Sequence, residues 1–186
     1  MKKIAYIVII FGIVSCNHYK KKNDVPEKLT NNIELIEIYQ KDQSERQVEN
    51  IDWEILLQQD SLREIRVKQL LDSNNVRTSL DYHNAAMIFQ HGLDTFASGM
   101  AVRLMRKSVE LDSTTNKWLL AAAIDRDLMR RNEPQIYGTQ YVKMGNDALW
   151  ELYKLDSTKI IDSVRIEYNV ETLAEQRETV KSMNKK

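Results

Sequence analysis

The chain has 186 residues, and its 27 basic and 27 acidic side chains give a formal net charge of zero at pH 7. Without a basic surplus, the composition argues against nucleic acid as a partner. Three histidines and one cysteine are poor material for a metal site, and His83 and His91 stand eight residues apart, whereas ligands on one helix are spaced by three or four. With no phosphate-binding glycine loop and no nucleophile motif in the sequence, we expect neither a metal nor another cofactor.

Residues 1–15 have the pattern of a secretory signal, with two lysines followed by an apolar run from Ile4 to Val14. As a helix this run would reach only about 17 Å, well short of the roughly 30 Å hydrocarbon core of a bilayer. Residues 13–16 resemble the lipobox of bacterial lipoproteins, in which the cysteine is acylated. The resemblance implies that Cys16 is lipidated and anchors the chain to a membrane; the alternative is an ordinary signal peptide with a chance cysteine.

Residues 16–31 are polar and basic, and their lack of an apolar period predicts a flexible tether. In lipoproteins of double-membraned bacteria, an aspartate after the cysteine favours the inner membrane, and here Asn17 follows instead. The same resemblance therefore implies the outer membrane, with the domain in the periplasm or at the surface. Residues 32–186 are predicted to form a single, mainly helical domain.

The first helix is expected at about 28–49 and the second at about 52–71. The second helix has apolar residues on two opposite sides, which predicts that it is sandwiched between neighbours. One stripe consists of Ile51, Ile55, Leu62 and Ile65, and the other of Trp53, Leu56, Val67 and Leu71.

Further helices are predicted at about 80–91, 97–111 and 116–131. The last two are joined by residues 110–114, have small residues where they would touch, and loosely resemble a tetratricopeptide or Sel1-like helical pair. The period then changes to alternation at 137–143 and 148–154, which predicts a β-hairpin.

The hairpin turn is expected at residues 144–147, where Gly145 and Asn146 accept positive φ angles. Ser157 is expected to cap a helix that continues to about Tyr168, and a last helix spans about 171–183. The predicted fold class is therefore mainly α, with helical hairpins, one small β-hairpin and C-terminal helices.

Asp125 is the residue of the fifth helix that least fits its position. At 100° per residue it falls inside the apolar arc of that helix, whereas Arg126 and Asp127 rotate away from it. A carboxylate in that arc needs polar partners to replace its lost water. The nearest donors in sequence belong to the irregular stretch 134–141: Gln135, Tyr137, Thr139, Gln140 and the N–H groups near Gly138. We expect this stretch to turn back and hydrogen-bond to Asp125.

Two interpretations of this centre stay open. Asp125 either fixes how the hairpin docks on the helices or belongs to a site that binds or transforms a ligand. For His91 the alternatives are a catalytic role and a plain helix C-cap before Gly92.

The order of these polar motifs resembles a bacterial family of unknown function that shares a QH, DR and PQ-x-YGTQ series. The matching positions are Gln90, His91, Asp125, Arg126, Pro134, Gln135, Tyr137, Gly138, Thr139 and Gln140, with Asp42, Gln43 and Arg46 upstream. The resemblance covers roughly residues 33–175 and implies a shared architecture, and no reaction comes with it. Glu133 stands where a glycine is expected.

Two functions follow from these patterns. The first is a membrane-anchored binding or scaffolding module in the cell envelope, with an envelope protein as a possible partner. The second is a small-molecule or hydrolytic site with His91 as base, Asp125 as its orienter and Arg126 as an anion clamp. Its ligand-binding candidates are Gln90, Gln135, Tyr137, Thr139 and Gln140.

Overall fold

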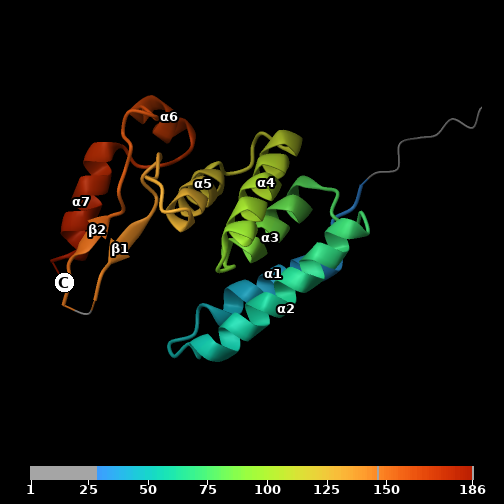
Figure 1. Cartoon of the computed structure of the whole chain (residues 1–186). Coiled ribbons are helices and arrows are strands. Elements are labelled where there is room, and N and C mark those ends of the chain that lie inside the picture. Colours follow the sequence, from blue (N-terminus) through green and yellow to red (C-terminus); the bar gives the residue numbers. More distant parts are fainter. Residues whose placement is uncertain (1–28, 146, 186) are drawn as a thin grey trace, which may run out of the picture.

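The computed structural model describes residues 29–145 and 147–185, and these residues are mainly helical with one small β-hairpin, as predicted (Figure 1). The signal segment 1–15, Cys16 and most of the tether lie outside the described residues. The elements in chain order are α1 (Ile33–Glu45), α2 (Trp53–Asp72), α3 (Ser79–Gln90), α4 (Thr95–Leu111), α5 (Trp118–Arg130), β1 (Tyr141–Lys143), β2 (Trp150–Leu152), α6 (Asp162–Glu167) and α7 (Leu173–Met183).

Side chains just before several helices define where those helices begin. Asp52 accepts hydrogen bonds from the first turn of α2, and Thr78 and Thr172 form capping boxes at α3 and α7. The start of α6 was predicted wrongly, because that helix begins at Asp162 after Ile161 and has no side-chain cap from Ser157.

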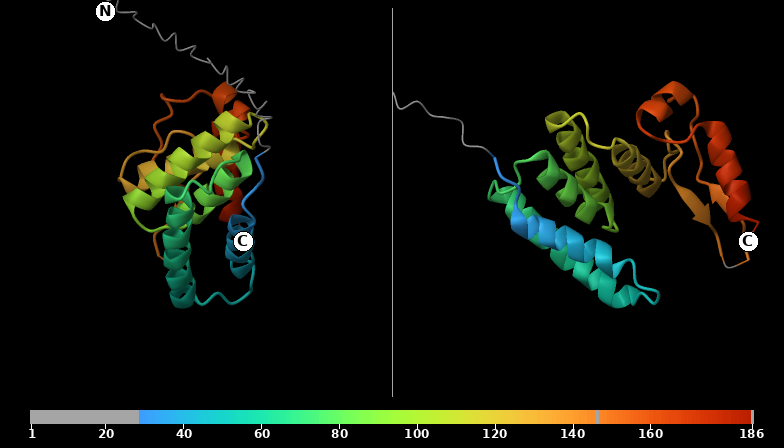
Figure 2. Two further views of the ribbon diagram at one scale, coloured as in Figure 1. Left: turned by 90° about the vertical axis from the view of Figure 1, so that its right-hand side faces the viewer. Right: turned by 180° about the vertical axis from the view of Figure 1, so that it is seen from behind.

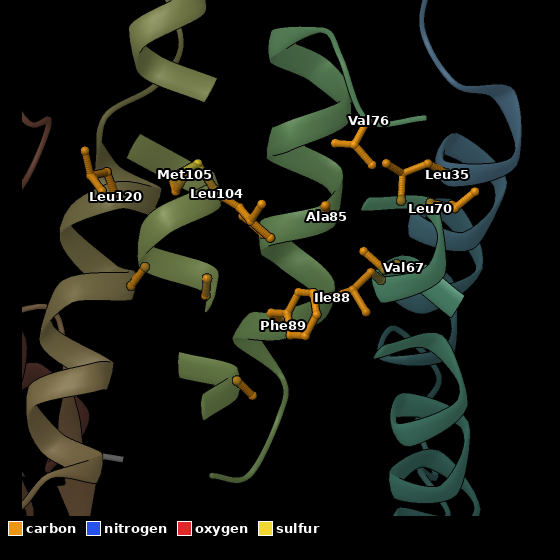
Figure 3. Close-up of a cluster of buried hydrophobic side chains, with 14 residues drawn as sticks. Leu35, Val67, Leu70, Val76, Ala85, Ile88, Phe89, Leu104, Met105 and Leu120 are labelled. Carbon is orange, nitrogen blue, oxygen red and sulfur yellow. The ribbon is translucent and has the colours of Figure 1, made fainter. Parts of the chain in front are cut away.

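The main core lies among α1 to α5, where aliphatic side chains and Phe89 interdigitate with alanines of α3, α4 and α5 (Figure 3). The helices α3 and α4 pack most closely against each other, and the predicted pair α4 and α5 is also in contact. The small alanines let their backbones approach closely, and the large side chains fill the space on either side.

A second, smaller core joins α5 to the C-terminal elements. It contains Ala121, Tyr137 and Val170, with the Tyr137 and Tyr168 rings 4.9 Å apart. Figure 2 shows β1, β2 and α7 at the end of the molecule opposite to α1 and α2. Because α5 contributes to both cores, it connects the helical layers to the hairpin end.

The hairpin pairs Tyr141 with Leu152 and Lys143 with Trp150 in antiparallel register. Its first strand was predicted to start at 137 but begins at Tyr141. Residues 136–140 instead form a loop whose N–H groups bind Asp125. Gly145 has the expected positive φ, 108°, and Asn146 lies outside the described residues.

The prediction that α2 is sandwiched on both sides is wrong. Its inner face buries Leu56, Val67 and Leu70 against the core, whereas Ile55, Leu62 and Ile65 on the outer face are exposed. Across residues 29–145 and 147–185, every helix is too short or too polar to cross a membrane.

Candidate functional site

Asp125 is completely buried, and the following loop supplies its hydrogen-bond donors as the sequence predicted, although the side chains of Gln135, Tyr137 and Gln140 are not among these donors. Its Oδ1 accepts the backbone N–H groups of Ile136 and Tyr137 at 2.9 and 3.0 Å. Its Oδ2 accepts the N–H groups of Gly138 and Thr139 and the Thr139 hydroxyl, each at 2.9 Å. Five donors replace the water that the carboxylate loses, so the charge is tolerated inside the protein.

The other side of the same loop faces a buried arginine. Arg165 of α6 donates from Nε to the carbonyl of Tyr137 and from Nη2 to that of Ile136, at 3.0 and 3.1 Å. Two consecutive peptide groups therefore point their N–H ends at Asp125 and their C=O ends at Arg165. The aligned dipoles connect a buried negative charge to a buried positive one, and each charge stabilises the orientation that the other requires.

Gly138 is needed for the shape of this loop. Its φ is +94°, which favours glycine, and a Cβ atom there would lie 2.0 Å from Oε1 of Gln176. Gln176 of α7 is itself fully buried and donates to the carbonyls of Tyr137 and Glu171. Its Oε1 is buried without a hydrogen-bond partner among the described residues.

The two glutamines of the motif fasten the ends of the loop. Gln135 donates to the carbonyls of Gln140 and Tyr153 and accepts the N–H of Gln140, all at 2.9 Å. Gln140 reaches back to Thr139 and to the carbonyl of Ala122 on α5. These side chains are structural parts of the loop, and Tyr137 packs in the small core.

A cavity of about 340 Å³ lies beside this loop, and we call it the loop cavity. It is lined by Trp118, Gly138, Thr139, Tyr141, Asn169, Val170, Glu171, Gln176 and Thr179. Two aromatic side chains, three hydroxyl groups, two amides and one carboxylate meet here, with no basic side chain among them. Such a mixture of apolar surface and a few fixed polar groups is typical of a small-molecule site.

Glu171 is held in place across this cavity. Its carboxylate accepts hydrogen bonds from the hydroxyls of Thr179, at 3.1 and 3.2 Å, and Tyr141, at 3.5 Å. Burial, followed by the charge of Glu171, raises the pKa of Tyr141 to about 12, so Tyr141 stays a neutral donor. The cavity wall therefore carries a negative charge and no compensating cation.

His91 lies in a second polar centre, and the prediction that Asp125 orients it is wrong. Its Nδ1 lies 3.1 Å from the carboxylate of Asp42, and it ends α3 as the C-cap. Asp42 is as deeply buried as Asp125, and Arg46 binds it at 2.7 Å. Arg63 lies 3.5 Å from it.

The two arginines of this centre also bind Asp60 of α2, at 2.6 and 3.0 Å. We call Asp42, Arg46, Asp60, Arg63 and His91 the charged cluster. Burial alone would raise the pKa of Asp42, but the hydrogen bond and charge of His91, together with Arg46, lower it below its ordinary value.

The charged cluster includes a set of potential metal ligands. Asp42, Asp60 and His91 offer ligand atoms within 4.8 Å of one another. The guanidinium groups of Arg46 and Arg63 bind the same carboxylates. The cations of the protein itself thus neutralise these acids, and the arrangement is that of an ion-pair network.

Glu64 lines a smaller pocket beside His91 and Asp94. Burial, followed by the charges of Asp94 and Asp60, raises the pKa of Glu64 to about 7.

Arg126 and Gln90 belong to neither the loop cavity nor the charged cluster. Arg126 donates from Nη1 to the carbonyl oxygen of Gln90 at 3.2 Å and so ties α5 to the end of α3. Burial, followed by the charge of Arg130, lowers the pKa of Arg126. The predicted anion clamp is thus engaged with the backbone, and of the predicted ligand-binding residues Thr139 lines the loop cavity.

Sequence reasoning missed several side chains of these centres, among them Arg165, Gln176 and Arg63. Arg165 and Gln176 come from helices far along the chain, and no local pattern marks them as partners of the loop. Arg63 had a usable signal, because it and Asp60 lie three residues apart on the buried face of α2.

Comparison with known protein families, characterised proteins and solved structures finds no match to this chain. The resemblance to the QH, DR and PQ-x-YGTQ series and to tetratricopeptide pairs therefore stays a prediction.

Proposed function

We propose that the chain is a lipid-anchored binding protein of the cell envelope that holds a small neutral ligand in the loop cavity. The observation that supports this function best is the wall of that cavity. It places Gln176, with a buried and unpartnered oxygen, next to a loop that Asp125 and Arg165 hold from both sides. A wall fixed before binding lowers the conformational entropy that the protein loses when a ligand binds.

The chemistry of the lining indicates the class of ligand. Glu171 accepts hydrogen bonds in the cavity lining, so the ligand should donate them. Trp118 and Tyr141 offer aromatic surface for an apolar face. An anionic ligand is disfavoured, because Glu171 would repel it and no lining residue is basic. A sugar has these properties, with several hydroxyl donors around a ring whose C–H face is apolar.

Asp125 has a supporting role in this proposal. Both of its oxygens are used by the loop, and it is shielded from solvent, so it shapes the wall without touching the ligand. A hydrolytic centre built from His91 and Asp125 lacks the contact that it needs, because His91 binds Asp42.

The binding function is tested with neutral and charged sugars. Glucose, N-acetylglucosamine and glucose 6-phosphate would be titrated into the detergent-solubilised full chain and followed by saturation-transfer NMR and calorimetry. We expect a neutral sugar to bind and the phosphorylated one to bind far more weakly. Trp118→Ala should weaken binding of the neutral sugar roughly tenfold or more.

Trp150→Ala is the matched control, because Trp150 is 37% exposed against 40% for Trp118 but lies outside the cavity lining. Equal losses in the two variants, or no binding of any neutral sugar, would refute the ligand site.

The anchor is tested separately. Cys16→Ala should move the chain from the membrane fraction to the soluble fraction, and it should leave sugar binding unchanged because residue 16 belongs to the predicted tether. If the variant stays in the membrane fraction, acylation of Cys16 is not the anchor.

A further inference from the structure

The outer face of α2 carries large apolar side chains that nothing in the described part of the chain covers. Ile55, Leu62 and Ile65 are 57–58% exposed, and Figure 1 shows α2 along the lower edge of the molecule. Isolated exposed aliphatic residues are ordinary on a protein surface. Three of them in line on one long helix call for an explanation.

The spacing of these residues is that of a coiled-coil seam. Ile55, Gln58, Leu62, Ile65 and Gln69 follow one another at intervals of three and four, and all five are exposed. This is the heptad pattern of alternating a and d positions, a stripe narrower than the apolar face of a membrane-surface helix. The 20 residues of α2 extend about 30 Å, long enough for a helix-to-helix contact of several turns. The face therefore fits another helix better than it fits a flat lipid surface.

The charges beside the seam indicate which partner helix, and in which orientation, can pack against it. Asp52 and Glu54 flank it at the N-terminal end, and Arg66 and Lys68 flank it at the C-terminal end. They occupy the e and g positions of the heptads, where interhelical ion pairs form and set the orientation of a coiled coil. In a parallel pair of identical helices, like charges would lie together at each end.

An antiparallel pair brings opposite charges together. Asp52 then faces Arg66 of the second copy, and Glu54 faces Lys68 of the second copy. The same arrangement places Ile55 opposite Ile65, and Gln58 opposite Leu62, of the second copy. Every pairing is repeated by a two-fold axis near the middle of α2, which is the self-complementarity that a symmetric dimer requires.

We propose that two copies of this chain associate through the outer faces of their α2 helices, packed antiparallel. Within one chain, Arg66 also binds Glu34 and Lys68 binds Asp72. These side chains are about half exposed or more, and such exposed pairs rearrange at little cost. The dimer leaves the loop cavity free, because that cavity lies at the opposite end of the molecule.

The association is tested by sedimentation of the full chain in detergent over a range of concentrations. We expect a reversible dimer that Ile65→Glu weakens roughly tenfold or more. Ile166→Glu is the matched control, since Ile166 is also helical and 61% exposed but lies on α6. Both replaced side chains are on the surface, so circular dichroism should show unchanged folding. A monomer at every concentration, or equal weakening by both variants, would overturn the proposal.

Charge reversal tests the orientation. Glu54→Lys and Lys68→Glu should each weaken the dimer, and the double variant should recover it, because each helix then regains an opposite charge across the two-fold axis. Loss of association that the double variant does not restore contradicts the antiparallel packing.

Disulfide cross-linking tests the orientation of the two helices independently. Two variants that each carry one cysteine on α2, and Cys16→Ser to remove the native cysteine, would be mixed and oxidised. Chains with Ile55→Cys and Ile65→Cys should cross-link to each other in preference to themselves. Cross-links between two copies of Ile55→Cys would instead show a parallel pair. Binding of the Cys16→Ser chain to phosphatidylcholine vesicles, without self-association and with loss of binding in Ile65→Glu, would identify the face as a membrane contact and overturn the dimer.

Discussion

Asp42 and Asp125 are both completely buried in helices, with 0% of either side chain exposed, yet they are stabilised in different ways. Asp125 accepts four backbone N–H groups and one hydroxyl, all uncharged and all from residues 136–139. Asp42 is surrounded by charged side chains from α1 and α2 and by His91 at the end of α3. One aspartate organises a loop, and the other joins three helices.

The two aspartates also differ in whether their hydrogen-bond donors have another acceptor when the aspartate is replaced. The N–H groups around Asp125 are fixed by the backbone and have no other acceptor within the loop. The arginines around Asp42 also bind Asp60 and Glu45, so they keep partners when Asp42 is changed. Buried donors that lose their acceptor cost more than donors that redistribute among several. Loss of charge should therefore be more damaging at Asp125 than at Asp42.

The largest effect is expected for Asp125→Asn. An amide keeps one acceptor oxygen, and its NH₂ group would face at least two N–H donors, which leaves buried groups unpaired. We expect a loss of about 4 kcal/mol or more in the free energy of unfolding, measured by urea denaturation.

Asp127→Asn is the control on the same helix. Asp127 is only partly buried and binds Ser98 and Arg131, so its loss should cost about 1 kcal/mol or less. Similar losses for the two variants would contradict the role of the loop donors.

A smaller loss of stability is expected when Gly138 of the loop is substituted and Asp125 is kept. Gly138→Ala forces a Cβ atom against Gln176 at a φ of +94°, whereas Gly145→Ala meets nothing within 4 Å at a φ of +108°. Both substitutions strain the backbone by about 1–2 kcal/mol, and the first adds a steric clash. We expect Gly138→Ala to lose roughly 3 kcal/mol and Gly145→Ala about 1 kcal/mol in thermal unfolding. Equal losses would show that the contact with Gln176 is easily relieved.

The sequence predicted the Asp125 centre well because its parts are close together in the chain. An acid in an apolar arc and an irregular, donor-rich stretch about one helical turn beyond the end of that helix are local patterns. The helix order and the hairpin were predictable for the same reason, from apolar period and turn residues.

The charged cluster was not predicted because its members meet only in the folded chain. Asp42 and Arg46 look like an ordinary exposed pair one turn apart, and nothing in α1 alone shows that α2 and His91 cover them. The prediction that α2 is sandwiched between neighbours failed for a related reason. Periodicity shows that the outer face of α2 is apolar, but it does not show what covers that face.

The smallest effect in this comparison is expected for Asp42→Asn, and it should depend on pH. The pKa of Asp42 is lowered in the folded chain, so its charge stabilises the fold above the unfolded pKa, and this stability is lost as pH falls through the folded value. At pH 7 we expect Asp42→Asn to lose about 2 kcal/mol, less than a fully broken buried ion pair because the arginines keep Asp60.

As the pH falls below the unfolded pKa of aspartate and through the lowered pKa of folded Asp42, the wild type should approach the variant in urea denaturation, since protonated Asp42 is as neutral as asparagine. Glu37→Gln, an exposed change on α1, should leave the stability at pH 7 nearly unaltered. A gap between wild type and Asp42→Asn that stays constant with pH would mean that shape, and not charge, is what the cluster requires at this position. The two buried aspartates would then differ only in their partners.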